Sequence, residues 1–291
     1  MTTALAQARS ALDPAVGVRL RAFRTAVRAF HAAPVQPRTI AVVGLDPGAG
    51  RSTVTAMLAL LAAGFSGRRV VVIDTATPTA GPRSAPGAMP ATDDAAARTV
   101  TALLGGDVLQ GRLPRLVEAA ASGGVPRRLI TAALTPDAAV PVLSLPPGPG
   151  GFAPQLLERA LERLAFRADL ILVDTPVGPR APVLHGVLDL ADHFLLVVRG
   201  DADLSRQAAA GRAWLATAPG LPRHRPSSLV VVSRGLRAAR PGPALTEGGP
   251  VTVLRRDEAL RRRRPEAMSR SSVITGLRLA TRLLSPVPSG L

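Results

Sequence analysis

The sequence predicts a single-domain α/β fold with a mostly parallel sheet and helices on both faces. Short apolar segments at 40–43, 70–73 and 170–173 are typical of buried strands, and they alternate along the chain with segments of helical periodicity. The 291 residues are enough for one large core. That core must consist mainly of Ala, Leu and Val, because the chain has only six Phe, one Trp and no Tyr.

The first predicted element is a helix over residues 14–33. Its periodicity places Leu20, Phe23, Val27 and Phe30 on one face. We expect this face to pack on the sheet. The alternative is a basic amphipathic helix on the surface that binds lipid or a partner.

Residues 39–53, TIAVVGLDPGAGRST, predict a short strand, a glycine-rich loop and the first turn of a helix. The N–H groups of a first helical turn are unpaired and the helix dipole adds positive charge, so this arrangement cradles an anion. Glycines let the backbone pass close to a phosphate. Ser52 is placed to hold Mg²⁺. A strand, turn and helix of small residues without a ligand is the alternative. The expected nucleotide-binding residues are Gly48, Ala49, Gly50, Arg51, Ser52 and Thr53.

The loop departs from the common pattern G-x-x-x-x-G-K-[ST] at two positions. Leu45 stands where the first glycine belongs, and Arg51 replaces the lysine. All 36 basic residues of the chain are arginine, which with abundant Ala, Gly and Pro is typical of a GC-rich genome. The replacement still changes the chemistry, because a guanidinium is a planar fork and an ammonium a compact point charge.

Two predicted buried strands end in an aspartate. Segment 69–74 ends in Asp74, and segment 168–174 ends in Asp174. A Mg²⁺ ion bound to phosphates needs a carboxylate near the hydroxyl of Ser52, at the carboxyl end of a buried strand. We therefore expect Ser52 and Asp174 to be the metal ligands.

These motifs resemble those of the ParA/MinD family of nucleotide-dependent positioning ATPases. Residues 46–52 align with the family's deviant loop K-G-G-x-G-K-[ST]. The order and spacing of the loop, the Asp74 strand and the Asp174 strand, which would be the Walker B strand, also match the family pattern. By element order, the resemblance covers residues 36–284. The run P-G-x-G-[KR]-S-T also resembles the loop of the bacterial tyrosine kinases, which share the architecture.

The resemblance implies a P-loop NTPase that binds ATP and Mg²⁺ and forms a homodimer. Its role would be in intracellular positioning or partitioning, or in a division or secretion machine with a protein partner. The resemblance assigns catalytic roles to Arg51 and Asp74, and it puts Ser233 where the family often has an adenine-reading asparagine.

Three departures from the family pattern affect catalysis. Arg51 replaces the phosphate lysine, Asp46 replaces the signature lysine, and Ala76 stands in place of a second acid after Asp74. All three lost features serve transition-state charge, so we expect slow or no ATP turnover. A non-catalytic pseudo-ATPase scaffold that binds a protein partner, DNA or membrane stays open as the alternative. A regulator related to the tyrosine kinases is a third hypothesis, although the absence of Tyr disfavours an autophosphorylating tail.

The net charge of +16 is concentrated at the two ends of the chain. Residues 1–38, a basic N-terminal helical extension before the main domain at 39–291, hold six Arg and one Asp. Residues 222–291 hold 14 Arg and four acidic residues. This pattern predicts contact with DNA phosphates, without base readout, or with an anionic membrane. A merely soluble arginine-rich surface is the alternative. The expected polyanion site is Arg261, Arg262, Arg263 and Arg264.

The remaining predictions concern the location of the protein, its histidines and its other helices and strands. The absence of Cys suits a cytoplasmic protein, which could lie at the nucleoid or membrane periphery, and no segment is apolar for long enough to span a membrane. The four His show no ligand spacing. Residues 76–98 predict a flexible loop. Further helices are predicted over 98–122, 152–166, 203–217 and 272–284, and further strands over 129–133, 140–145, 193–199, 228–233 and 251–254.

Overall fold

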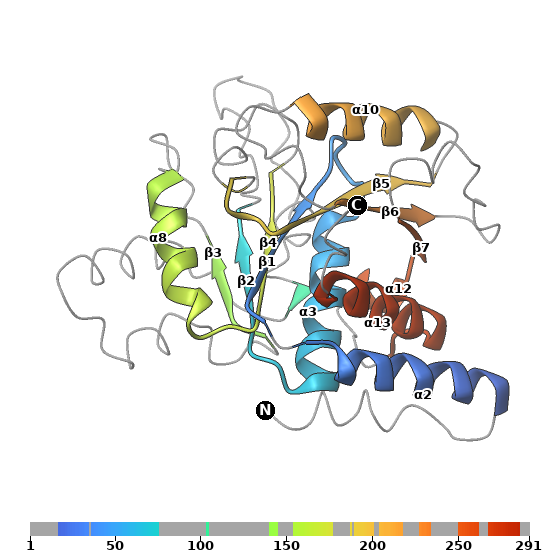
Figure 1. Ribbon diagram of the computed structural model, residues 1–291. Coiled ribbons are helices and arrows are strands. Elements are labelled where there is room, and N and C mark those ends of the chain that lie inside the picture. Colours follow the sequence, from blue (N-terminus) through green and yellow to red (C-terminus); the bar gives the residue numbers. More distant parts are fainter. Residues whose placement is uncertain are drawn as a thin grey trace, which may run out of the picture.

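The computed structural model of the chain confirms an α/β sandwich built on one parallel sheet (Figure 1). It describes residues 17–34, 36–75, 103–104, 140–144, 154–176, 187, 189–200, 204–217, 227–233, 250–261 and 267–285. The predicted loop at 76–98, the predicted strand at 129–133 and most of the predicted helix at 98–122 lie outside these residues.

The sheet has seven strands in the order β3-β2-β4-β1-β5-β6-β7, and each neighbouring pair is parallel. The strand that precedes the glycine-rich loop, β1, therefore lies between β4 and β5. Because all strands run the same way, their carboxyl ends share one edge of the sheet. The strands are β1 (Arg38–Val43), β2 (Val70–Asp74), β3 (Val142–Ser144), β4 (Leu170–Asp174), β5 (His193–Arg199), β6 (Ser227–Ser233) and β7 (Val251–Arg255).

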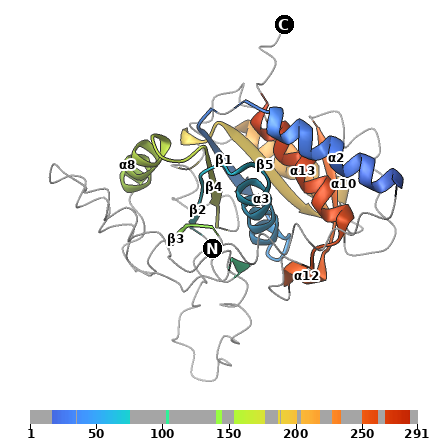
Figure 2. The same ribbon diagram turned by 90° about the horizontal axis from the view of Figure 1, so that it is seen from below.

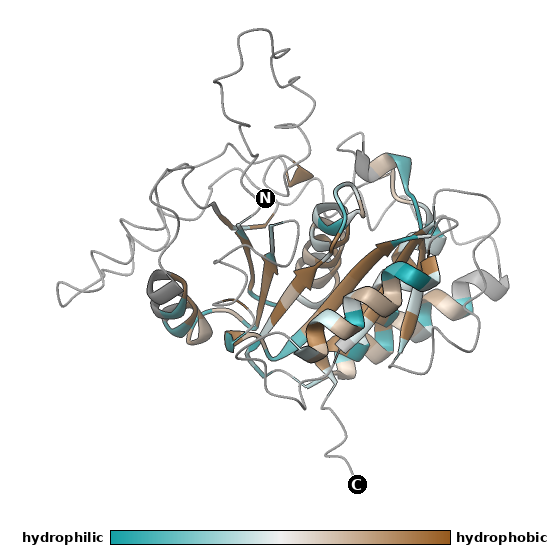
Figure 3. Ribbon diagram, turned by 90° about the horizontal axis from the view of Figure 1, so that it is seen from above, coloured by the Kyte–Doolittle hydropathy of each residue, from teal (hydrophilic) through white to brown (hydrophobic). Residues whose placement is uncertain are grey.

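Helices cover both faces of the sheet (Figure 1). Side chains alternate along each strand, so Ile40 and Val42 of β1 belong to one core and Ala41 and Val43 to the other. The first core is covered by α2 (Gly17–Ala32), α3 (Arg51–Ser66) and α13 (Arg270–Leu284), and the second by α8 (Pro154–Ala165) and α10 (Leu204–Thr217). The short α12 (Glu258–Arg261) follows β7. Strands are apolar along most of their length, as Figure 3 shows, because both of their faces are buried.

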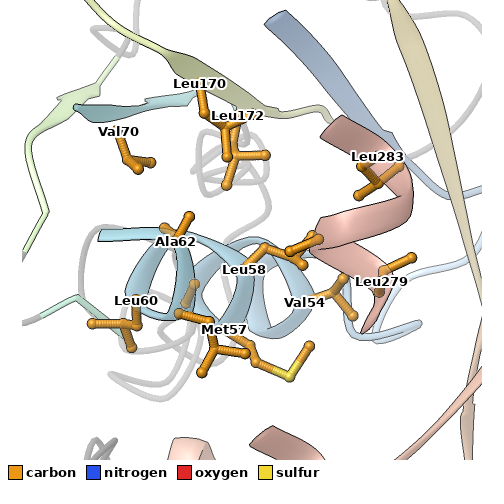
Figure 4. Packing of buried hydrophobic residues seen from close by; sticks show 14 of the residues in the cluster. Val54, Met57, Leu58, Leu60, Ala62, Val70, Leu170, Leu172, Leu279 and Leu283 are labelled. Carbon is orange, nitrogen blue, oxygen red and sulfur yellow. The ribbon is translucent and has the colours of Figure 1, made fainter. Parts of the chain in front are cut away.

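Helix α3 is the central helix of the first core. Its residues are mostly Ala, Leu, Val and Met, and 11 of its 16 residues are buried. Figure 4 shows Leu170 and Leu172 of β4 on one side of α3 and Leu279 and Leu283 of α13 beside it. The helix that begins at the glycine-rich loop is therefore held in place by the sheet and by α13.

The predicted N-terminal helix is confirmed as α2, but its main neighbours are the helices α13 and α3 rather than the sheet. Figure 2 shows α2 and α13 side by side. Phe30 is fully buried, and Phe23 packs edge to face on Phe65 of α3, with ring centroids 5.8 Å apart. The Arg68 guanidinium donates to the carbonyl of Ala33 (2.6 Å) and lies 5.7 Å from the Phe30 ring centroid.

Predicted and observed element bounds differ by a few residues at most where both exist. The helix predicted at 152–166 spans Pro154–Ala165, and the one predicted at 272–284 begins two residues earlier, at Arg270. Ser269 caps that last helix by accepting a hydrogen bond from the Ser272 N–H, a cap that the prediction did not use. None of the helices in the described ranges is long and apolar enough to cross a membrane.

Candidate functional site

The glycine-rich loop connects β1 to α3 at the carboxyl edge of the sheet. Gly48 (φ 70°) and Gly50 (φ 100°) both adopt left-handed backbone, which a side chain disfavours. Gly50 is the N-cap of α3, and no side chain caps the helix there. The first-turn N–H groups are thus left for another acceptor. This is the geometry of an anion cradle.

The loop is packed against the end of β6. A Cβ built at Gly50 would lie 3.2 Å from Cγ2 of Val232, so the loop approaches this strand closely. Ser233, the next residue, is buried, and its carbonyl accepts a hydrogen bond from the Arg256 N–H. Ser233 therefore lies at the same edge of the sheet as the loop. Whether it contacts a nucleotide base stays a prediction.

Ser52 and Asp174, the two predicted metal ligands, are in direct contact, and their binding of a metal ion stays a prediction. The Ser52 hydroxyl donates to Oδ2 of Asp174 over 2.6 Å. Asp174 is completely buried, and its other oxygen, Oδ1, has no hydrogen-bond partner. A buried carboxylate oxygen without a partner is costly unless a ligand or water satisfies it.

Asp74 and Asp174 lie side by side, because they are register partners on the neighbouring strands β2 and β4. The residues after them hold the strand ends together. Both the N–H and the hydroxyl of Thr75 donate to the Asp174 carbonyl, at 3.0 and 2.6 Å, and Thr175 binds the Val42 carbonyl of β1 in the same way. Burial and the neighbouring Asp74 raise the pKa of Asp174 to about 7, although Arg51 and the Ser52 hydroxyl act in the opposite direction.

Arg51 enters this site from the start of α3. Its side chain is buried at 8% exposure and passes over Gly44, where a Cβ would lie only 2.8 Å from the Arg51 Cδ. Its Nη1 donates to the carbonyl of Thr175, directly after Asp174. Burial lowers the pKa of Arg51, whereas the nearby carboxylates of Asp174 and Asp74 raise it. The replaced lysine position is therefore occupied by a guanidinium that points into the site.

The residues present fit a Mg²⁺ ion. Mg²⁺ prefers oxygen ligands and in phosphate-binding sites takes only one or two from the protein, the remainder coming from phosphates and water. The Ser52 Oγ and the unpartnered Oδ1 of Asp174 are oxygen atoms of the kind that would serve as these ligands. Within the described ranges, no group of three or more His, Asp or Glu side chains could hold a metal ion.

The other predicted site residues are placed less fully. Ala49 is buried, Thr53 is half-buried, and Asp46 is half-buried with its carbonyl accepting the Ala49 N–H at 3.4 Å. Arg261 ends α12, and Arg262, Arg263 and Arg264 lie outside the described residues.

Sequence reasoning did not find three features of this site. The Thr175 carbonyl, Gly44 and Val232 each form part of the arrangement around Arg51 or the loop. The only available signal was their position, directly after an aspartate-ended strand or at the end of a predicted strand. A backbone carbonyl leaves no trace in residue type, and a glycine such as Gly44 does not tell which side chain passes over it.

A parallel sheet, a glycine loop at the amino end of a helix and a Ser–Asp pair below it define the architecture of a P-loop NTPase. Comparison with solved structures then narrows the fold. The chain is similar to a ParA family ATPase from Chlorobium tepidum TLS, with a TM-score of 0.64 and 14% identity over 84% of this chain and 99% of that one.

Two further solved structures are MinD proteins. The cell division ATPase MinD of Pyrococcus furiosus matches with a TM-score of 0.59 and 20% identity, over 86% of this chain and 100% of that one. The septum site-determining protein MinD of Pyrococcus horikoshii OT3, complexed with Mg-ADP, matches with a TM-score of 0.55 and 19% identity, over 84% and 94%. No family model matches the sequence, and the search of curated proteins finds no match. The chain thus has the ParA/MinD fold, as the sequence motifs predicted.

Proposed function

We propose that this protein is a ParA/MinD-like ATP-binding protein that acts as a nucleotide switch in intracellular positioning or partitioning, or in a division or secretion machine. The observation that carries the proposal is the contact between Ser52 and the fully buried Asp174 beneath the uncapped start of α3. That contact would join a phosphate cradle to a cation site at one edge of the sheet.

Each residue of the loop would have a separate task in binding. The N–H groups of the first turn of α3 would donate to the β- and γ-phosphates, and Gly48 and Gly50 would let the phosphates come close. Ser52 and Asp174 would hold Mg²⁺, which when bound neutralises phosphate charge. Ser233 would lie near the adenine base of the nucleotide. In this proposal, the nucleotide state controls a homodimer, as the resemblance implies.

Hydrolysis is proposed to be slow or absent. The guanidinium of Arg51 donates to the Thr175 carbonyl, so it is held by the protein rather than left free to follow the developing charge on the γ-phosphate. The sequence also has Ala76 where a second acid would follow Asp74. We therefore expect the protein to bind ATP but to hydrolyse it slowly or not at all.

Calorimetry with ATP and ADP in the presence of Mg²⁺ tests this proposal. We expect micromolar binding by the natural protein and its loss in Ser52→Ala. Ser271→Ala is the matched control, because it removes an exposed serine on α13. Absence of binding by the natural protein at millimolar nucleotide would overturn the proposal. A turnover assay on a binding-competent protein would then separate a switch from an ATPase.

A second candidate function is a scaffold that binds a polyanion through its arginine-rich ends, at the nucleoid or at an anionic membrane. One observation favours it: α2 contains no acidic residue, and its Arg21, Arg24 and Arg28 side chains are all exposed. Arg278 on the adjacent α13 is also exposed. Contacts between exposed arginines and phosphates do not depend on the base sequence. The affinity that they provide falls steeply as the salt concentration rises.

Retention on duplex DNA at increasing salt tests the second candidate. Replacing Arg261–Arg264 by Ala is expected to weaken retention, and replacing Arg21, Arg24 and Arg28 is expected to lower the slope of log affinity against log salt by about 3. Anionic vesicles serve as the parallel probe for a membrane. Unchanged DNA and vesicle retention in both variants would exclude these arginines as the binding surface.

A further inference from the structure

We propose that the Arg51 guanidinium is the resident counter-cation of the Asp74–Asp174 pair, so that a divalent cation can enter this site only by competing with it. The inference deepens the proposed function and rests on it in one respect: it takes this edge of the sheet as the magnesium site. It adds a regulatory property that depends on the buried guanidinium of Arg51, which would be a resident competitor for the divalent cation.

The first step is that the carboxylates of Asp74 and Asp174 are held close to each other. Parallel register places Asp74 directly opposite Asp174, and the hydrogen bonds from Thr75 to the Asp174 carbonyl hold the two strand ends together. Asp174 is fully buried and Asp74 is nearly so, at 6% exposure. Two negative charges in such a site repel each other strongly, because little water screens them.

The second step is that a cation is already supplied by the chain. The aliphatic part of Arg51 is guided across Gly44 to the end of β4, where its Nη1 donates to the carbonyl that follows Asp174. Burial lowers the pKa of Arg51, and the carboxylates of Asp174 and Asp74, which end the neighbouring strands β4 and β2, raise it. Arginine keeps its charge in buried positions, and its guanidinium is planar and rigid. The positive charge is therefore always present and has a fixed position beside Asp174.

The third step is the competition. The Oδ1 atom of Asp174 has no partner and is the oxygen that a cation would bind. A divalent ion at that oxygen would share a dry site with the guanidinium and be repelled by it. Removal of the guanidinium should therefore strengthen cation binding and make the protein depend on the cation for stability.

Thermal unfolding of the nucleotide-free protein in EDTA, Mg²⁺ or Mn²⁺ tests the inference. We expect the midpoint of the natural protein to change little with the cation. Arg51→Met keeps the unbranched apolar part of the side chain without the guanidinium and its charge. This variant should unfold at a lower temperature in EDTA and recover in millimolar Mg²⁺ or Mn²⁺. Mn²⁺ affinity, followed by electron paramagnetic resonance, should rise about tenfold or more in this variant. Arg24→Met controls for the change in net charge.

A second variant keeps the test decisive if Arg51→Met does not fold alone. Adding Asp174→Asn removes the unbalanced buried charge, so the double variant should regain stability in EDTA and lose its response to Mn²⁺. Failure of the double variant to fold would mean that Arg51 acts through packing, and it would overturn the inference. Equal stability in EDTA and equal Mn²⁺ affinity for Arg51→Met and the natural protein would also overturn it. None of these measurements uses nucleotide, so failure of the switch proposal would appear separately, as absent ATP and ADP binding in calorimetry.

Discussion

At the scale of single residues, the sheet buries polar groups at both of its edges. The carboxyl edge holds Asp74, Asp174 and Arg51, which belong to the proposed nucleotide site. The amino edge holds His193, the first residue of β5, whose Nε2 lies 3.0 Å from the Ser228 Oγ on β6. Burial, helped by the positive charge of Arg38, lowers the pKa of His193 to about 4. This histidine therefore stays neutral in the folded protein where an exposed one would ionise.

The neutral His193 predicts a loss of stability in mild acid. Between pH 6.5 and pH 4 the unfolded chain binds a proton at this residue and the folded chain does not, so the free energy of unfolding should fall as pH is lowered. The two pKa values imply a loss of about 3 kcal/mol across that window. Urea unfolding at a series of pH values measures it. His193→Gln should remove this part of the pH dependence, whereas His31→Gln, at an exposed position, should retain it. Parallel curves for all three proteins would contradict the assignment.

At the scale of elements, one arginine ties the carboxyl end of α2 to the end of α3, in addition to the apolar contacts of α2. The Arg68 guanidinium follows α3 in the chain and donates to the Ala33 and Pro34 carbonyls just after α2, at 2.6 and 3.1 Å. Those carbonyls lie at the carboxyl end of a helix. A cation is favourable there because of the helix dipole, and a carbonyl without a hydrogen-bond donor is unfavourable. The sequence alone suggested an extension, whereas the contacts make α2 part of the helical layer.

Loss of this anchor should destabilise the protein by about 2 kcal/mol, because charged hydrogen bonds to helix-end carbonyls are removed. Arg68→Met tests the prediction in urea unfolding. Arg69→Met is the matched control: Arg69 is the next residue, and its side chain is mostly exposed in an ion pair with Asp169. We expect a smaller loss there, because exposed ion pairs contribute little. Equal losses in the two variants would argue against the anchor.

The contact between α13 and α3 depends on one glycine. A Cβ at Gly276 would lie 2.4 Å from Cδ1 of the buried Leu61, so the two helices approach more closely than any larger residue allows. Alanine favours helix over glycine, yet the overlap should outweigh that gain. Gly276 thus sets the distance between the last helix and the helix of the glycine-rich loop.

Gly276→Ala is expected to lower the free energy of unfolding by about 1–2 kcal/mol. Shortening the opposing side chain should relieve the overlap, so the double variant Gly276→Ala/Leu61→Val should lose less than the two single variants together. Ser271→Ala, at an exposed position of the same helix, controls for general effects on α13. Simple additivity of the two changes would show that the helices do not meet as described.

At the scale of the whole molecule, the site is assembled from four strands. The loop follows β1, the two aspartates end β2 and β4, and Val232 of β6 supports Gly50 from the other side. A ligand that binds these ends at once should stabilise the entire sheet. The linkage predicts a gain of about 2.7 kcal/mol in the free energy of unfolding at a nucleotide concentration of 100 times Kd.

Thermal unfolding with increasing ADP and Mg²⁺ measures this gain. We expect the midpoint of the natural protein to rise with the logarithm of ligand concentration above Kd. Gly50→Val should abolish the response, because a side chain at φ 100° strains the loop and meets Val232. Arg24→Ala should respond like the natural protein. A response that survives in Gly50→Val would place the nucleotide elsewhere.

Much of this architecture was predictable from local patterns. Apolar runs that end in Asp74 and Asp174, and the glycine loop before Ser52, are short-range signals, and they correctly predicted the strands, the loop and the parallel sheet. The contact between Ser52 and Asp174 followed from the rule that parallel strands bring their carboxyl ends together. These features follow from residue type and spacing alone.

Other features required the tertiary structure, because they depend on residues far apart in the chain. The sequence showed that Arg51 replaces a lysine, yet only packing decided that its side chain crosses Gly44 and reaches the Thr175 carbonyl, directly after Asp174. Likewise, periodicity predicted α2 but not its neighbours α13 and α3. Local sequence determines which elements form, since helix and strand signals act over a few residues. The direction in which a buried charged side chain points depends on the residues packed around it, and these come from distant parts of the chain.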